Sequence, residues 1–275
     1  MNIFQSIVIS FVEGITEFLP ISSTGHMVIT SSLFGIEKDA FTKLFEVSIQ
    51  LGAILAVVVL YWKKFINLKD YRFYLKLLIA VIPSLIFGKL LDERIDAALG
   101  NPVFISCMFI GGGIFLLFVD RIFNQSEIQE ESQLTYFKAL KVGLFQVLAI
   151  ALPGISRSAA TIIGGMTQKL NRHLAAEFSF FLAVPTMAAA TAYSLILKDW
   201  SVLGIQEKGY ELILDNSNYL LLFIVGNIVA FIVALLAIKF FIGFLQKHGF
   251  RLFGWYRIIA GILFLGLIYA GIIHA

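Results

Sequence analysis

The chain has 275 residues, of which 59% are hydrophobic and only 14% are charged. This composition, with a mean hydropathy of +0.89, excludes a soluble globular domain. The formal net charge of +3 identifies no partner, and we expect no nucleic-acid partner for such a chain.

Six stretches are apolar over the roughly 20 residues that a helix needs to cross a bilayer. We therefore predict an all-α integral membrane protein with six transmembrane helices in a single membrane domain, 1–275. The N-terminus carries no positive residue and is followed by no small-residue cleavage site, so we expect no removable signal peptide. Cys107 lies within an apolar stretch, where we expect it to serve packing. In chain order, the predicted spans are 42–62, 73–91, 103–119, 175–197, 219–240 and 255–273.

Two further hydrophobic segments, 3–34 and 136–168, are interrupted by proline and by polar residues. Each runs to Leu-Pro, breaks, and restarts on a serine-rich turn. Glu13 and Gln146 each lie seven residues before the proline of their segment. Polar and charged groups at membrane depth are costly and are functional by default. The sequence therefore predicts a functional site at these two breaks.

Basic residues indicate the orientation of the spans. Lysine and arginine crowd the connections 63–72 and 239–257, which the positive-inside rule assigns to the cytoplasmic side. The connections 89–101 and 198–218 are net acidic, as outside loops allow. Six spans then place both ends of the chain outside and the linker 120–135 inside.

These sides are consistent with six membrane crossings only if each of the two interrupted segments enters and leaves the membrane on the same side. We interpret them as re-entrant helix pairs, the first opening outside and the second inside, because irregular backbone at that depth is tolerated where it lines a cavity. The halves, about 1–125 and 133–275, then form inverted repeats, which are typical of transporters. The stretches 110–116 and 259–265 have similar sequences, as repeats would. The alternative is that their glycines serve ordinary close packing of helices.

Glu13 and Glu17 are four residues apart, so their carboxylates share one face of a helix. Two adjacent buried carboxylates either share a proton or bind a cation. We favour a divalent cation, Mg²⁺ or Ca²⁺, because hydroxyl and phosphate oxygens would complete its shell. A solvated or helix-capping pair is the alternative, which the surrounding Ile-Val-Ile-Ser-Phe-Val opposes.

Ser22 and Ser156 each follow a proline and are placed to cap the helix that restarts there. Free amides and the positive end of a helix dipole form an anion site. Two such ends facing each other suit a diphosphate, and capping without a ligand is the alternative. The residues that we expect to bind substrate are Ser22, Thr24, Gly154, Ser156, Ser158, Thr161, Glu46 and Gln50.

Ser23 and His26 are three residues apart on a helix, which lets an imidazole approach a hydroxyl and activate it as a nucleophile. A purely structural histidine is the alternative. Glu46 and Gln50, four apart, open one span and are expected to line the cavity from the side. Glu177 holds a comparable place in the second half but lies closer to the inner face.

Arg157 and Thr161 share a face of the second restarted helix. The arginine side chain binds phosphate through two hydrogen-bond donors and stays positively charged. Without phosphate, we expect Arg157 to pair with Glu13, Glu17 or Glu46. Three carboxylates then face one guanidinium, and a diphosphate adds negative charge that a dry site cannot hold. This imbalance favours a divalent cation, so we predict a metal-assisted phosphoryl transfer.

Residues 13–26 (Glu-Gly-Ile-Thr-Glu-Phe-Leu-Pro-Ile-Ser-Ser-Thr-Gly-His) and 153–161 (Pro-Gly-Ile-Ser-Arg-Ser-Ala-Ala-Thr) resemble the two signature motifs of the undecaprenyl-diphosphate phosphatases, the bacitracin-resistance family. Residues 45–52 and 177–185 also resemble that family, and the likeness runs from end to end. The motifs are long and mostly polar within apolar sequence, which makes chance matching negligible.

The resemblance implies a phosphoric anhydride hydrolase that converts undecaprenyl diphosphate to undecaprenyl phosphate and phosphate. This reaction recycles the lipid carrier of peptidoglycan synthesis and confers bacitracin resistance by removing the antibiotic's target. The resemblance also implies a divalent cation, a place in the bacterial plasma membrane, and a polyprenyl diphosphate and membrane lipids as partners.

Carried over to this chain, Glu13 and Glu17 match the family's acidic pair, which is taken to hold the metal or assist proton transfer. Arg157 matches the phosphate-binding arginine, and the nucleophile is Ser23 or His26. We favour Ser23 because amides of the first helical turn would also stabilise the phosphoryl oxygens.

A transporter or flippase of a polyprenyl phosphate is the main alternative, because inverted repeats are typical of transporters. Such a carrier has no evident use for the acidic pair, Ser23 and His26 together. A purely structural membrane protein is the third hypothesis. The first re-entrant pair carries most of the chemistry and opens outward, so we expect hydrolysis at the external face. The preferred prenyl length, the physiological metal and a homodimer are left open.

Overall fold

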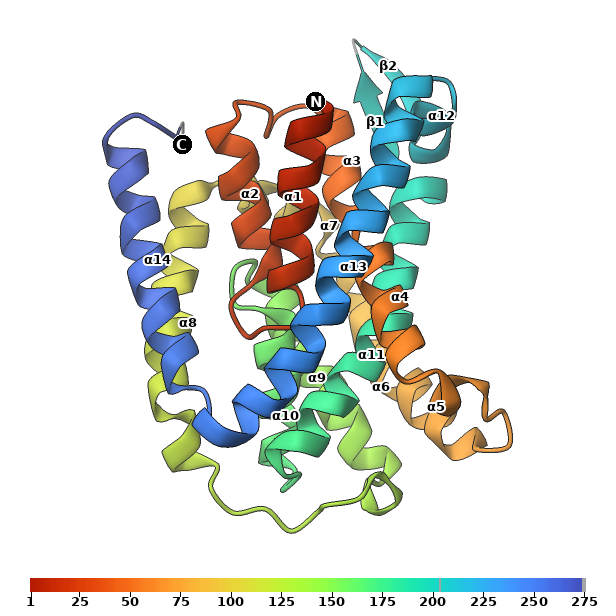
Figure 1. Ribbon diagram of the computed structural model, residues 1–275, viewed down its shortest axis with the longest axis vertical. Helices are drawn as coiled ribbons and strands as arrows, with labels where there is room; N and C mark the ends of the chain where they lie inside the picture. Colours follow the sequence, from red (N-terminus) through yellow and green to blue (C-terminus); the bar gives the residue numbers. More distant parts are fainter. Residues whose placement is uncertain (203, 274–275) are drawn as a thin grey trace.

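The structure, a computed structural model, describes residues 1–202 and 204–273. Within these residues, six helices are long and apolar enough to cross a membrane, as the sequence predicts. The chain is thus an all-α, multi-pass membrane protein (Figure 1). The six helices are Ala40–Leu60, Tyr71–Leu90, Pro102–Ile122, Arg172–Leu197, Ser217–His248 and Arg251–Tyr269.

Two of these spans consist of two consecutive elements. The first is interrupted at Ile49, and the fourth ends in a π-helical turn. The elements of the spans are α3 (Ala40–Ser48), α4 (Gln50–Leu60), α6 (Tyr71–Leu90), α8 (Pro102–Ile122), α11 (Arg172–Ala192), η2 (Tyr193–Leu197), α13 (Ser217–His248) and α14 (Arg251–Tyr269). Short elements connect them: α5 (Trp62–Ile66), α7 (Asp92–Leu99), η1 (Glu131–Gln133), the antiparallel strands β1 (Asp199–Val202) and β2 (Ile205–Lys208), and α12 (Gly209–Leu214).

The two interrupted segments form helical hairpins. The first consists of α1 (Ile3–Thr16) and α2 (Ser23–Leu33), and the second of α9 (Tyr136–Ala151) and α10 (Arg157–Thr167). In Figure 1 the hairpins enter the molecule from opposite ends, and their turns meet near its middle. A turn forms in each because proline lacks an N–H group and disfavours a helical residue before it.

The other helices surround these hairpins in a similar way in both halves of the chain. In the first half α1 packs on α13, and in the second half α9 packs on α6. Small residues allow the close approach: a Cβ at Gly14 would lie 2.9 Å from the carbonyl oxygen of Ala230 on α13. The approach is closer at Gly143 of α9, where a Cβ would collide with the carbonyl oxygen of Ala80 on α6.

The glycine-rich stretches 110–116 and 259–265 lie in α8 and α14, which pack against each other along their length. A Cβ at Gly113 would lie 2.8 Å from the carbonyl oxygen of Gly254, and a Cβ at Gly261 would lie 2.8 Å from that of Ser106. Close helix packing, the alternative given for this similarity, therefore accounts for these glycines.

The structure corrects two predictions. The connection 239–257 is not a loop, because α13 continues to His248 and α14 begins at Arg251. The apolar sequence of α13 has no helix-breaking residue at 240, the predicted end of this span. The helix therefore continues through the polar residues up to His248. Cys107 is exposed on α8 and does not serve internal packing.

Candidate active site

The first break contains residues 17–22, between α1 and α2. Ser22 caps α2, as predicted, because its hydroxyl accepts a hydrogen bond of 3.4 Å from the backbone N–H of Gly25. Its φ of 72° is rare for a residue with a side chain. The cap leaves the first amides of α2 directed into the turn.

The second break has the same local design. Ser156 caps α10 by accepting a hydrogen bond of 3.2 Å from the N–H of Ala159, and its φ is 81°. Gly154 has a φ of 101°, a conformation open to glycine without strain. Two serine caps with left-handed backbone thus occupy equivalent places, and such backbone costs on the order of 1–3 kcal/mol per residue.

Three predicted residues bond directly to one another. The guanidinium of Arg157 donates to Glu17 at 2.5 Å, and the Ser23 hydroxyl donates to the second oxygen of the same carboxylate. A second contact joins the breaks, because the Ser158 hydroxyl donates to the carbonyl oxygen of Leu19 at 2.7 Å. The pairing of Arg157 with a carboxylate was the alternative to phosphate binding, and the structure contains it.

Glu13 lies one helical turn before Glu17 and is completely buried. Neither of its carboxylate oxygens has a hydrogen-bond partner among residues 1–202 and 204–273. The charged groups that act on it are Glu17, Arg157 and Glu46. One oxygen of Glu46 is also without a partner in this described part of the chain. Unpaired oxygens of buried carboxylates are the feature that a cation would satisfy.

His26 does not bond to Ser23. Its Nδ1 lies 2.7 Å from the carbonyl oxygen of Ser22, one turn earlier, and its Nε2 lies 2.7 Å from the hydroxyl of Tyr256. A carbonyl only accepts, so Nδ1 carries the proton and the neutral ring accepts from Tyr256 at Nε2. The imidazole also stacks on the Tyr256 ring. The expected approach of this ring to the Ser23 hydroxyl is therefore wrong, because both of its nitrogens are bonded elsewhere.

Arg257 is the residue that sequence reasoning missed. The sequence places Arg257 in the basic connection 239–257, but in the structure its side chain is completely buried on α14. Its guanidinium donates to the carbonyl oxygens of Gly154 at 2.7 Å and Ile155 at 2.6 Å, and at 3.4 Å to that of Pro20. It also donates to Met108 and Phe109 on α8. A guanidinium that clamps both breaks adds a second positive charge next to the site.

The remaining predicted residues are more dispersed. Thr161 is buried on α10, where its hydroxyl lies 2.6 Å from that of Ser179 on α11. Thr24 and Gln50 are half-buried near the starts of α2 and α4. Glu177 lies 3.6 Å from His173 near the start of α11.

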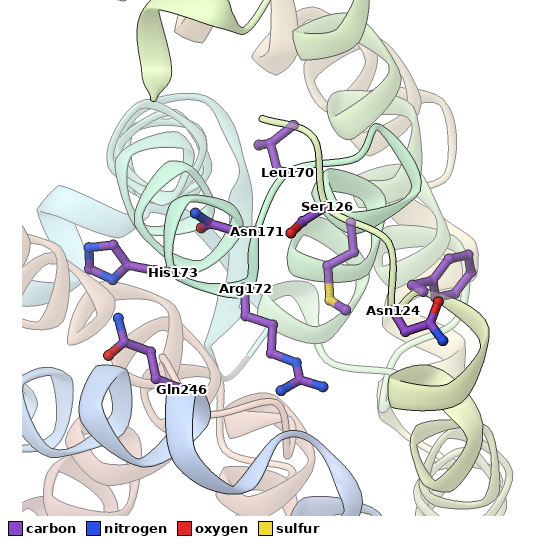
Figure 2. Close-up of a pocket in the computed structure, with 9 residues that line it drawn as sticks. Asn124, Ser126, Leu170, Asn171, Arg172, His173 and Gln246 are labelled. Atoms are coloured by element: carbon purple, nitrogen blue, oxygen red, sulfur yellow. The ribbon is translucent and has the colours of Figure 1, made fainter. Parts of the chain in front are cut away.

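A polar hollow of ≈ 340 Å³ lies at the ends of α8, α10 and α13 (Figure 2). Asn124, Arg172, His173 and Gln246 line it. Arg172 is already paired with Asp120 at 2.7 Å, so the guanidinium in this wall is neutralised. The hollow is therefore a poorer candidate for an anionic ligand than the two breaks.

The fold and the site together define a class of protein. It is an all-α membrane protein whose interior holds an ionic site built from two interrupted helices. Carboxylates, a hydroxyl, a guanidinium and two helix N-termini converge there.

Comparison with known proteins identifies the family. Residues 6–263 match the family described as bacitracin resistance protein BacA, and the chain belongs to that family. An undecaprenyl-diphosphatase of Flavobacterium johnsoniae is 56% identical over 266 residues, which cover 96% of each chain. A Porphyromonas gingivalis relative with the same description is 48% identical over 288 residues, covering 99% of each. That of Aquifex aeolicus is 44% identical over 266 residues, 96% of this chain and 98% of its own.

Proposed function

We propose that the two breaks form the active site of an undecaprenyl-diphosphate phosphatase. The chain hydrolyses undecaprenyl diphosphate to undecaprenyl phosphate and phosphate, which recycles the lipid carrier of peptidoglycan synthesis. The observation that carries the assignment is the row Ser23–Glu17–Arg157, a hydroxyl, a carboxylate and a guanidinium bonded in sequence across both breaks. Membership of the bacitracin-resistance family supports it.

In this mechanism Ser23 is the nucleophile. Its oxygen attacks the terminal phosphorus, the new O–P bond forms, and the bond to the bridging oxygen breaks. Glu17 takes the hydroxyl proton and passes it to the leaving polyprenyl phosphate. The carboxylate then takes a proton from the water that hydrolyses the phosphoserine and returns it to the Ser23 oxygen.

Arg157 binds the terminal phosphate, for which it is the nearest planar cation. The amides at the starts of α2 and α10 stabilise the phosphoryl oxygens as charge develops on them. Arg257 holds the carbonyl groups of both breaks and so keeps these amides in place. The two bonds made by His26 support a positioning role and favour Ser23 as the nucleophile.

A divalent cation, Mg²⁺ or Ca²⁺, fits Glu13 and Glu17. The unpaired Glu13 oxygens are the supporting observation. No group of three or more His, Cys, Asp or Glu side chains is close enough to hold a metal among residues 1–202 and 204–273. Two carboxylates completed by substrate phosphate and water are a usual set for Mg²⁺. When bound, the ion would neutralise charge on the diphosphate.

We also propose that the hairpins are re-entrant and that the halves, about 1–125 and 133–275, are inverted repeats. The matching packing of α1 on α13 and α9 on α6 supports this, as do the two left-handed serine caps. With basic connections inside, the first hairpin opens to the external face of the bacterial plasma membrane. The site would then receive substrate from that side.

The experiment that tests the function measures phosphate released from undecaprenyl diphosphate by purified protein with Mg²⁺ or Ca²⁺. Wild type should turn over, and Ser23→Ala and Arg157→Ala should each lose most activity. Near wild-type turnover by both variants would refute the site. Right-side-out vesicles given external substrate should release phosphate only outside.

The alternative of a lipid-phosphate carrier remains a separate hypothesis. A carrier needs its site to open to each side in turn. The clamp of Arg257 on both breaks opposes their separation, and transport alone has no use for the Ser23–Glu17 hydrogen bond. One-sided labelling of cysteines placed along 20–26 and 153–158 in every state would count against a carrier.

A further inference from the structure

An apolar groove of ≈ 330 Å³ lies between α8, α9 and α10, beside the second break. Its size falls within the roughly 300–1,000 Å³ of small-molecule sites. Phe115 and Leu148 line it, and each remains about half exposed. The chemistry of the ionic site does not itself require this groove.

The groove exists because α8 carries consecutive glycines there. A Cβ at Gly111 would meet nothing within 4 Å in the part of the chain that the structure describes, so this position borders open space. A Cβ at Gly112 would instead collide with the Arg257 guanidinium. On α10, Ala159 and Ala160 line the groove with short side chains. Only small residues at these positions keep the groove open.

The groove borders the second break. Ile155 lines it, and the carbonyl oxygen of this residue accepts the 2.6 Å hydrogen bond from Arg257. Two residues later, Arg157 pairs with Glu17. A molecule whose phosphate lies at Arg157 is therefore two residues along the chain from one wall of the groove between α8 and α10.

We infer that this groove holds the first isoprene units of the substrate after its diphosphate; the inference rests on the function proposed above. The prenyl chain is covalently joined to the phosphates, so binding of the head brings these units beside Ile155. Membrane lipid is as apolar as the groove, so transfer out of lipid gains little. The contribution of the groove is its shape, which directs the chain and thereby aligns the diphosphate with Ser23.

The test fills the groove with Gly111→Leu, where the added side chain has room. For undecaprenyl diphosphate, kcat/KM should fall by at least about 10-fold, the usual effect of an altered apolar pocket. Hydrolysis of dimethylallyl diphosphate, which has one isoprene unit, should not change. The thermal unfolding temperature should also stay that of wild type.

Gly266→Leu and Gly243→Leu are matched controls. In the described residues, a Cβ at either position meets nothing within 4 Å, and neither glycine lines the groove. Both variants should retain wild-type kcat/KM. Wild-type kcat/KM for Gly111→Leu, an equal loss on both substrates, or the same loss in the controls would overturn the inference.

A second measurement does not depend on turnover. A polyprenyl diphosphate with a diazirine on its second isoprene unit should label peptides of α8, α9 or α10. Excess undecaprenyl diphosphate should remove the label, and phosphatidylglycerol should not. Equal removal by phosphatidylglycerol would make the groove a site of bulk lipid and overturn the inference. Absence of phosphate release by wild type would instead refute the proposed function, while the label still reports on the groove.

Discussion

The side chains of Glu17 and Arg157, 140 residues apart in the sequence, form an ion pair that crosses the two breaks. Both are nearly buried, with side chains 6% and 15% exposed. A pair of this kind is costly to break on one side, because the remaining charge stays buried. It therefore holds the carboxylate that accepts from Ser23, the proposed nucleophile, and the guanidinium that we propose binds phosphate at a fixed separation.

Glu17→Gln should lower kcat by about 10²- to 10⁴-fold, the range for loss of a general base. The amide cannot accept the Ser23 proton, although it has nearly the same shape. Phosphate release under saturating substrate measures the effect. Glu131→Gln is the control, because Glu131 pairs with Lys64 and Lys76 far from the breaks. A Glu17→Gln enzyme as fast as the control would exclude Glu17 as the base.

A quenched reaction with substrate labelled in its terminal phosphate should trap a phosphoenzyme. Because we assign the attack to Ser23, the label should survive acid and map to a peptide that contains Ser23. Ser23→Ala should give no label. An acid-labile adduct on His26 would transfer the nucleophilic role to the imidazole.

Arg257→Lys should destabilise the fold by roughly 3 kcal/mol or more, because lysine cannot supply the planar set of donors that reaches both breaks. Activity should also fall, since the carbonyl groups of Gly154 and Ile155 lose their donors. Chemical unfolding and phosphate release measure the two effects. Arg251→Lys, at the exposed start of the same helix, should be neutral.

Chelation of divalent cations should abolish turnover, and added Mg²⁺ or Ca²⁺ should restore it. Glu13→Gln should raise the metal concentration for half-maximal rate by at least about 10-fold, since loss of even an outer partner of a ligand costs 10- to 100-fold. A metal titration of the rate measures this shift. An unchanged titration would remove Glu13 from the metal site.

Ser156→Thr should destabilise the protein by about 1 kcal/mol or more, although the hydroxyl cap is kept, because a branched side chain is strained at positive φ. Ser156→Asn should be nearly neutral, since asparagine caps helices and tolerates this backbone. Unfolding free energies compare the two. At Thr135, which caps α9 with a φ of −80°, Thr135→Asn should change little. Equal effects of threonine and asparagine at position 156 would show that the turn relaxes.

The sequence was sufficient to predict the six spans and both breaks, because proline and serine act on their local backbone. Charges within apolar sequence need a partner, and the structure brings together Glu17, Ser23 and Arg157, which the sequence singles out; their catalytic roles stay predictions. The sequence could not predict the partners of His26, because Tyr256 comes from a helix 230 residues away. Helical spacing alone predicted that this imidazole approaches the Ser23 hydroxyl.

Arg257 was missed for a different reason. It follows Lys247 and Arg251, so in the sequence it looks like one more basic residue of a cytoplasmic connection. The apolar sequence that follows gave the only signal, because it places Arg257 about two turns into α14. Which carbonyl groups it reaches depends on how α14 packs on α8 and on both hairpins, and no local pattern encodes that.

The clamp made by Arg257 also bears on the order in which the site is assembled. A membrane protein is inserted from its N-terminus as it is synthesised, at about 5–20 residues per second. Both hairpins are therefore synthesised before Arg257, which donates to carbonyl groups of each. A truncated product that ends before Arg251 would keep the contacts of Arg157 with Glu17 and of Ser158 with Leu19 but lack the bonds of Arg257 to both breaks, so the set of contacts between the breaks is complete only late in translation.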